Sequence, residues 1–130
     1  MDILNEAEAF VMTDIAAGND HPLLMMNLNR YAEGAFPDGA LYREWRQVNA
    51  AMISEVGGKI LWTLPVHGHI LANGPVQPLD EILAYWYPSH QSFLAMRGSE
   101  SGKRNFEIRQ TLIEHAIVHR CDGERPPVRP

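Results

Sequence analysis

The order in which two hydrophobic periodicities follow each other along the chain restricts its fold more than any other feature. A run with period-two spacing at residues 23–29 precedes a helical stripe at 40–56, and strand-like runs follow at 59–64, at 81–87 and, near the end, at 116–121. A second helical region lies before the last run. The order is therefore strand–helix–strand–strand–helix–strand, which predicts an α+β fold with helices on one face of a four-stranded sheet.

Residues with strong capping or turn preferences set the expected boundaries of the other segments. Ser89 is placed as the N-cap of a short helix, and we expect Gly98 and Gly102 to end that helix. A further helix is expected at residues 103–115. We also expect residues 66–72 to continue the second strand or to form a short extra strand.

This order of elements is the split βαβ arrangement of ferredoxin-like domains. The second face of such a sheet has no helices, so Met25, Tyr85 and Tyr87 or their neighbours would be exposed there unless another surface covered them. A second copy of the chain, related by a two-fold axis, is the usual solution. We therefore expect a homodimer through the open sheet face, packed as a dimeric α/β barrel.

The length of 130 residues fits one domain with short extensions. Residues 1–21 are expected to be an N-terminal helical extension, with its helix at residues 3–17. Residues 22–121 form the expected ferredoxin-like domain. Residues 122–130 contain several prolines and are expected to be a frayed tail.

Composition excludes several classes of partner. The formal net charge of -5 argues against nucleic acid, because phosphate binding needs a basic face. Arg43 and Arg46 lie among acidic residues in the first helical stripe and are expected on an ordinary solvated face. No apolar run approaches the roughly 20 residues of a membrane span, so no membrane partner is expected. The acidic start of the chain is unlike a secretory signal, and a cytoplasmic location is expected.

Several short segments together resemble a known family. They are the strand Leu23–Asn29, Tyr42 in the first helix, the turn Val56-Gly57-Gly58-Lys59, the step Tyr87-Pro88-Ser89 with the following Phe93-Leu94-Ala95-Met96, and Arg109 before the last strand. Over residues 22–121 the chain resembles a domain-of-unknown-function family of the dimeric α/β-barrel superfamily. Relatives by fold include small cofactor-independent monooxygenases and isomerases, so the resemblance implies the fold and the dimer more than an activity.

Two amides and a phenol are the first candidates for a binding site. Asn27 and Asn29 share one face of the first strand, and Tyr31 follows just past its expected end. Such groups can orient a carbonyl or a phenolate by hydrogen bonds. They can equally bond across a dimer interface or to nearby backbone, and the sequence does not separate these readings.

The second candidates are aromatic. Trp62, Tyr85, Trp86 and Tyr87 could stack on a flat ring, although packing in the core or at an interface explains them equally well. A tyrosine that faced a wet cavity would be a candidate general acid or proton relay. We therefore assign Trp62 and Tyr87 to substrate binding and Tyr85 to catalysis.

Arg109 is the main candidate for contact with an anion. It falls in a helix with apolar patterning, and an arginine turned inward is costly unless it is paired. A salt bridge to Glu107 or Glu114, or a surface position, is the simpler interpretation. With His119 on the last strand, Arg109 is still the best single candidate for contact with an anionic substrate.

Metal and nucleotide sites have little support. His67 and His69 alternate along the chain, but two histidines alone are a weak metal signal and exposed loop histidines are more common. The single cysteine, Cys121, is interpreted as a packed thiol. No Gly-x-Ser-x-Gly elbow or nucleotide-binding glycine pattern occurs, so no metal and no cofactor are expected.

Our leading functional hypothesis is a small cofactor-independent enzyme that acts on a modest apolar or aromatic anionic substrate. Asn29 and Arg109 would orient the anionic group, and His119 or Tyr85 would move protons. The alternative is a non-catalytic dimer that binds a ligand or has a structural role.

Overall fold

A computed structural model describes residues 12–124 of the chain. After a short helix at residues 12–16, the elements are β1 (Leu23–Tyr31), α2 (Ala40–Glu55), β2 (Lys59–Pro65), β3 (Glu81–Tyr87), α3 (His90–Ala95), a 3₁₀ turn η1 (Met96–Gly98), α4 (Glu100–Leu112) and β4 (Ile113–Asp122). The predicted order of strands and helices is confirmed. The expected helix at residues 3–17 falls largely on residues outside the described part, as does most of the expected tail.

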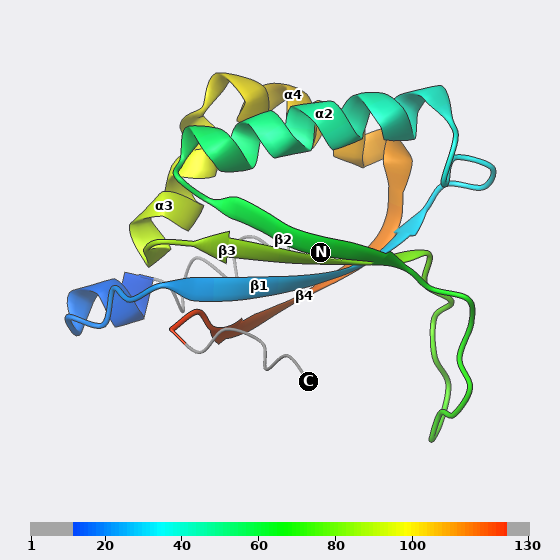
Figure 1. Ribbon diagram of the computed structural model, residues 1–130, viewed down its shortest axis with the longest axis horizontal. Coiled ribbons are helices and arrows are strands. Elements are labelled where there is room, and N and C mark those ends of the chain that lie inside the picture. The colour runs from blue at the N-terminus through cyan, green and yellow to red at the C-terminus, as the bar shows by residue number, and fades with distance from the viewer. Residues whose placement is uncertain (1–11, 125–130) are drawn as a thin grey trace.

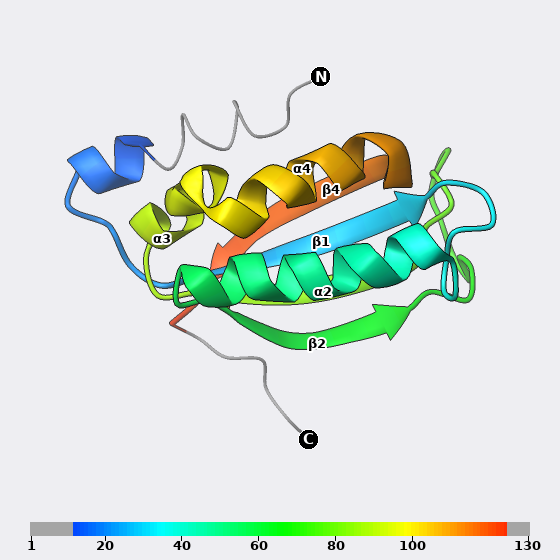
Figure 2. The same ribbon diagram turned by 90° about the horizontal axis from the view of Figure 1, so that it is seen from above.

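The four strands form one antiparallel sheet in the order β2-β3-β1-β4. Helices α2 and α4 lie side by side over one face of this sheet (Figures 1 and 2). In the described part of the chain no helix covers the other face. An α+β architecture of this kind is consistent with the ferredoxin-like fold.

Helix α2 is held on the sheet by one side. Trp45 is buried, and so are Met52 and Ile53, which follow it by seven and eight residues. This spacing puts the three side chains on a single stripe of the helix. Gly57 then adopts a positive φ of 79°, as expected for a left-handed cap. At Gly58 a side chain would lie 2.9 Å from the backbone oxygen of Trp86, so only glycine allows β2 to enter the sheet here.

Two serines cap the second helical region. The Ser89 hydroxyl accepts a hydrogen bond from the backbone nitrogen of Ser92 at 3.1 Å, which confirms the expected N-cap of α3. Ser99 caps α4 in the same way, with Gly102 as donor at 3.0 Å. The expectation that Gly102 breaks a helix is therefore wrong, because Gly102 lies inside α4 and is packed too closely against Met96 for any side chain.

Helix α4 and strand β4 also differ from their expected bounds. The helix begins three residues earlier than residue 103 because Ser99 caps it. It ends at Leu112, and Ile113 pairs with Tyr31 after an irregularity in the register. Strand β4 therefore begins at residue 113 rather than 116, because pairing with β1 overrides the helical pattern of the sequence.

The structure decides which of the two sets of alternate strand residues faces the helices. Met25, Tyr85 and Tyr87 lie on the face that the helices cover and are buried within the single chain. Their neighbours along the strands form the other face, which we call the open face. Its apolar residues are Leu24, Met26, Leu28, Trp62, Leu64, Ile82, Ala84, Trp86 and Ile117, and the same face also carries Arg30, Lys59, His115, His119 and Cys121. The sequence shows period two clearly but does not say which set of alternate residues faces the helices.

Residues 66–80 form a long connection between β2 and β3 that we call the arm. No part of the arm is a strand, so the expected extension of β2 over residues 66–72 is wrong. The two limbs of the arm are joined near the sheet by a hydrogen bond from the backbone nitrogen of Val66 to the oxygen of Asp80 at 2.8 Å. Figure 1 shows the arm leaving one end of the sheet and extending away from the helices.

The segment before β1 is attached to the opposite end of the sheet. Asp20 accepts hydrogen bonds from the backbone nitrogens of His90 and Gln91 at the start of α3, at 2.5 and 3.3 Å. Asp14 pairs with Arg120 on β4. These contacts join residues 12–22 to α3 and β4.

Among the described residues no helix is long and apolar enough to cross a membrane.

Candidate functional site

A buried carboxylate organises one end of the space between the helices and the sheet. Glu81 is only 3% exposed. Its oxygens accept hydrogen bonds from the hydroxyls of Tyr31 at 2.7 Å and Tyr42 at 2.8 Å, and from Arg46 Nη1 at 3.0 Å. One positive charge and two hydroxyl donors therefore satisfy the carboxylate, as a buried charge requires.

Three elements bring these groups together. Glu81 opens β3 directly opposite Asn29 in β1, and Tyr31 lies two residues further along β1 on the same face. Asn29 Nδ2 donates to the Tyr31 hydroxyl at 3.3 Å. Tyr42 and Arg46 are four residues apart on α2, so both reach toward Glu81 from one side of that helix.

A chain of amides continues this polar layer toward α4. Asn105 Nδ2 donates to Asn49 Oδ1 at 3.0 Å, and Asn49 Nδ2 donates to the Tyr85 hydroxyl at 2.7 Å. Because Tyr85 accepts the bond from Asn49, its own hydroxyl proton stays available. Among the described residues it has no acceptor within hydrogen-bond distance.

Arg109 carries a charge that no acid offsets. It lies four residues after Asn105 on α4, with its electrostatic interactions directed at Tyr85, Tyr31 and Tyr87. Burial around the guanidinium lowers the pKa of Arg109. In the part of the chain that the structure describes, Arg109 forms no hydrogen bond through its guanidinium and no ion pair.

The two expected acid partners of Arg109 are occupied elsewhere. Glu107 pairs with Arg104 at 3.1 Å, and Glu114 pairs with Arg30 at 3.7 Å. A salt bridge from Arg109 to either acid, which the sequence suggested as the simpler interpretation, is therefore wrong. Arg109 lies next to the buried Ile108 on α4, whereas Glu107 is exposed on that helix and Glu114 is exposed in β4.

Three polar atoms of the same layer are buried and have no hydrogen-bond partner among residues 12–124. They are Asn29 Oδ1, Trp45 Nε1 and Asn105 Oδ1. Buried polar atoms are nearly always hydrogen-bonded in native proteins, so unmatched groups concentrated in one layer need an explanation. We call the whole set the polar layer: Asn29, Tyr31, Tyr42, Trp45, Arg46, Asn49, Glu81, Tyr85, Asn105 and Arg109.

All four tyrosines of the chain lie on this side of the sheet, and their surroundings keep them neutral. Burial, and then the hydrogen bond to Glu81, raises the pKa of Tyr42 to about 12 and raises the pKa of Tyr31 further. Burial also raises the pKa of Tyr85 and of Tyr87 well above the ordinary value. These phenols can donate hydrogen bonds at neutral pH, but they are poor proton acceptors.

The structure separates the predicted site residues between the two faces of the sheet. Asn27, Asn29, Tyr31, Tyr85 and Tyr87 are buried on the helix-covered face, which Arg109 also approaches. Within this group Asn27 donates to the Met25 carbonyl at 3.1 Å and Tyr87 to Met96 Sδ at 3.3 Å, so these two are engaged in packing.

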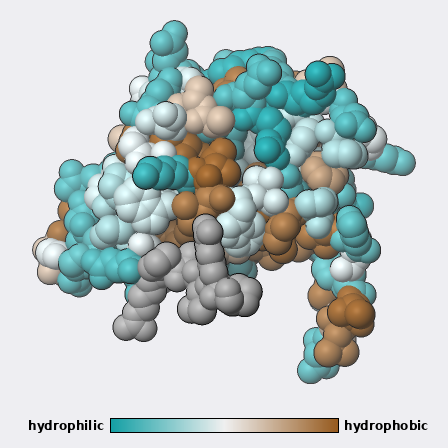
Figure 3. Space-filling view, in the orientation of Figure 1, coloured by the Kyte–Doolittle hydropathy of each residue, from teal (hydrophilic) through white to brown (hydrophobic). Residues whose placement is uncertain are grey.

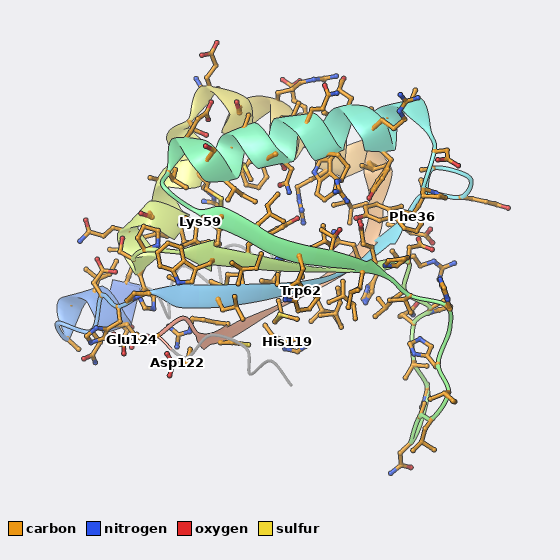
Figure 4. All side chains as sticks on the ribbon, in the orientation of Figure 1. Phe36, Lys59, Trp62, His119, Asp122 and Glu124 are labelled. Carbon is orange, nitrogen blue, oxygen red and sulfur yellow. The ribbon has the colours of Figure 1, made fainter. Side chains whose placement is uncertain are left out.

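Trp62 and His119 belong to the other face. Trp62 pairs with Ala84, and His119 pairs with Met26, so both side chains point away from the helices. Figure 4 places the labelled His119 below the sheet, opposite α2 and α4. A site in which His119 and Arg109 act together on one substrate is therefore not formed within this chain, because the sheet separates them.

Several members of the polar layer were not identified from the sequence. Arg46 was expected on a solvated face, but its guanidinium reaches under α2 to Glu81. Glu81 starts an otherwise apolar strand, and Asn49 and Asn105 interrupt apolar helical stripes. A polar residue on an apolar stripe is the signal that could have identified Asn49, Asn105 and Glu81 as buried groups.

The described residues contain no group of three or more histidine, cysteine or acidic side chains that could hold a metal ion. His67 and His69 lie in the arm, where the His69 ring interacts with the Gln77 carbonyl at 3.1 Å. Cys121 is a partly buried free thiol on β4.

Known structures resemble this one in fold. A protein of unknown function from Rhodopseudomonas palustris is 23% identical with a TM-score of 0.66, over 92% of this chain and 93% of that chain. The methylated form of that protein is 23% identical with a TM-score of 0.65, over 92% of this chain and 91% of that chain. A NIPSNAP family protein from Agrobacterium tumefaciens is 14% identical with a TM-score of 0.50, over 78% of this chain and 84% of that chain.

No protein-family model matches the chain, and no curated protein matches it. The similarities to solved structures therefore support the α+β fold and leave the activity to be argued from the residues.

Proposed function

We propose that the protein binds a small molecule with a carboxylate or another oxyanion between its helix layer and its sheet. The observation that carries the proposal is Arg109, a partly exposed residue beside the buried amides and phenols, whose guanidinium has no hydrogen-bond or acid partner among the described residues. An uncompensated charge of this kind destabilises a fold, so its presence favours a role in binding.

The unmatched atoms of the polar layer define the chemistry of the ligand. Arg109, Trp45 Nε1 and the Tyr85 hydroxyl supply donors without acceptors, whereas Asn29 Oδ1 and Asn105 Oδ1 are acceptors without donors. Donors outnumber acceptors, and one of them is charged. A molecule with an oxyanion and one or two hydroxyl or amine groups would satisfy this set.

The charge balance of the layer supports the same ligand class. The Glu81 carboxylate is already matched by Arg46 and by the hydroxyls of Tyr31 and Tyr42. The positive charge of Arg109 is left over on the side of α4. An anionic ligand would neutralise it, whereas a cationic ligand would add a second uncompensated charge.

A cofactor-independent enzyme is the second candidate. It is favoured by Tyr85, whose buried hydroxyl has a proton without an acceptor among the described residues and can donate it to an oxyanion that develops during a reaction. Tyr85 would stabilise charge rather than remove a proton. Binding without turnover of the bound molecule would leave the protein in the ligand-binding class.

We further propose that the open face pairs two copies of the chain. Trp62, Leu64, Trp86 and Ile117 belong to this face, and Leu64 and Ile117 are 53% and 40% exposed. A sheet face with an apolar centre can pack against its own copy about a two-fold axis, because the two apolar centres then meet. The polar layer would stay within each subunit.

The experiment is a thermal-shift screen of small aliphatic and aromatic carboxylic acids, each beside its uncharged amide. The variants are wild type, Arg109→Met and Arg104→Met. Arg104 is a matched control because it lies on the same helix but pairs at the surface with Glu44 at 2.7 Å.

We expect at least one acid, and not its amide, to raise the melting temperature of wild type and of Arg104→Met. The same acid should have no effect on Arg109→Met. Equal shifts in all three proteins, or no shift by any acid in wild type, would contradict the proposal. Product analysis on the active acid then separates an enzyme from a binding protein.

A further inference from the structure

The arm ends in exposed hydrophobic residues. Ile70 and Leu71 at its tip are almost wholly exposed, and Val76 on the returning limb is half exposed. Figure 3 shows hydrophobic surface at the far end of the arm, well away from the body of the molecule. Two adjacent aliphatic side chains so fully in water indicate an unfilled contact.

The base of the arm is attached to the sheet by several hydrogen bonds. The backbone N–H of Asp80 donates a hydrogen bond to the Asn29 carbonyl at 2.9 Å. The Asp80 carboxylate accepts a hydrogen bond from the backbone N–H of Tyr31 at 2.8 Å. Arg30 also reaches the Gln77 side chain at 3.5 Å. These contacts anchor both the arm and the polar layer to the end of β1.

The direction and charge of the arm indicate its partner. It extends on the side of the open face, beyond the plane of the sheet (Figure 1). Residues 66–80 contain no lysine or arginine, and the chain is acidic overall, which does not suit an anionic membrane surface. The exposed tip therefore suits an apolar protein surface on the side of the open face. A second copy of the chain, paired through that face, would supply such a surface.

The size of the open face supports the same conclusion. Strands about 4.8 Å apart, with seven to ten residues each at about 3.3 Å, give a four-stranded face about 20 Å wide and about 23 to 33 Å long. This footprint is smaller than the roughly 800 Å² that each partner buries in a stable interface. An arm that overhangs the face would supply much of the difference.

We infer that the arm clasps the partner subunit in a dimer of this chain, with Ile70 and Leu71 buried against the partner's surface. The inference rests on the proposed pairing through the open face. Because the arrangement is two-fold, each copy would both give an arm and receive one.

The test measures the dissociation constant of the full-length dimer by sedimentation for three variants. The first replaces Ile70 and Leu71 by serine, which removes the apolar tip without a change in charge. The second, Met12→Ser, is a control for loss of an exposed apolar side chain away from the arm. The third, Met26→Glu, places a charge on the open face.

We expect the double serine variant to weaken the dimer at least about tenfold, because two aliphatic side chains lose their burial. Met12→Ser should leave the constant unchanged, and Met26→Glu should abolish the dimer. If the double serine variant has the same dissociation constant as wild type while Met26→Glu is monomeric, the clasp by the arm is contradicted and the open-face dimer is supported. A monomeric wild type would overturn both.

Discussion

The two faces of the sheet differ in chemistry although they alternate residue by residue along the same strands. On the helix-covered face β1 presents Leu23, Met25, Asn27, Asn29 and Tyr31, and three of these five are polar or phenolic. On the open face the same strand presents Leu24, Met26 and Leu28, followed by Arg30. Within β1, the residues under the helices are thus the more polar set, and those on the face that no described helix covers are the more apolar set.

This inversion indicates that the two faces have different roles. A polar interior costs stability unless every group is matched, and here Arg109, Asn29, Trp45 and Asn105 are left with unmatched atoms. An apolar outer face is equally unfavourable for an isolated chain. Both features are explained if a ligand completes the first face and a second copy of the chain covers the other.

The largest expected effect comes from charges placed on neighbouring residues of β1. Met25 is 3% exposed under the helices, whereas Met26 belongs to the open face. Met25→Glu should lower the free energy of unfolding by more than about 4 kcal/mol, because it buries an unpaired carboxylate. Met26→Glu should leave the fold intact and yield a monomer.

Circular dichroism and sedimentation of the two variants measure these outcomes. Equal destabilisation of the fold by both charges would show that the open face is not a free surface of the folded chain. A folded Met25→Glu protein would contradict the assignment of the two faces.

This pair of residues also shows what the sequence can predict. Period two in Leu23–Asn29 and the order of elements predicted the sheet, its helices and most of their bounds. The orientation of β1 was not predictable, because both sets of alternate residues contain large apolar side chains. A one-residue change of register exchanges the faces, and only packing against α2 and α4 decides between them.

The next effect concerns alkaline pH. The raised pKa values of Tyr31, Tyr42, Tyr85 and Tyr87 favour their protonated forms in the folded state. The resulting stability is fully present below the ordinary tyrosine pKa of about 10 and is lost as pH rises through the higher folded values. We expect a loss of roughly 1 kcal/mol for each deeply buried phenol by about pH 11.

The measurement is urea unfolding at several alkaline pH values, with tyrosinate absorbance followed in the folded protein. The absorbance should stay low at pH values where free tyrosine has ionised. Ionisation of all four tyrosines near the ordinary pKa, without unfolding, would show that the polar layer is open to water.

The candidate site could be predicted only in part. Asn29, Tyr31, Tyr85 and Arg109 were selected from the sequence, and the structure brings them to one face. Their partners Glu81, Asn49 and Asn105 come from three different elements, and their meeting depends on tertiary packing. His119 and Trp62 could not be excluded because the face of each strand was unknown.

The most direct test measures the free energy of unfolding of Arg109→Met, for which the smallest change is expected. The protein is first refolded from denaturant so that any bound molecule is removed. If Arg109 is held uncompensated for a ligand, replacing it by an apolar side chain of similar length should raise the stability by about 1 kcal/mol or more. Arg104→Met should show little change. A clear loss of stability in Arg109→Met would contradict the account, because it would give Arg109 a structural role within the folded chain.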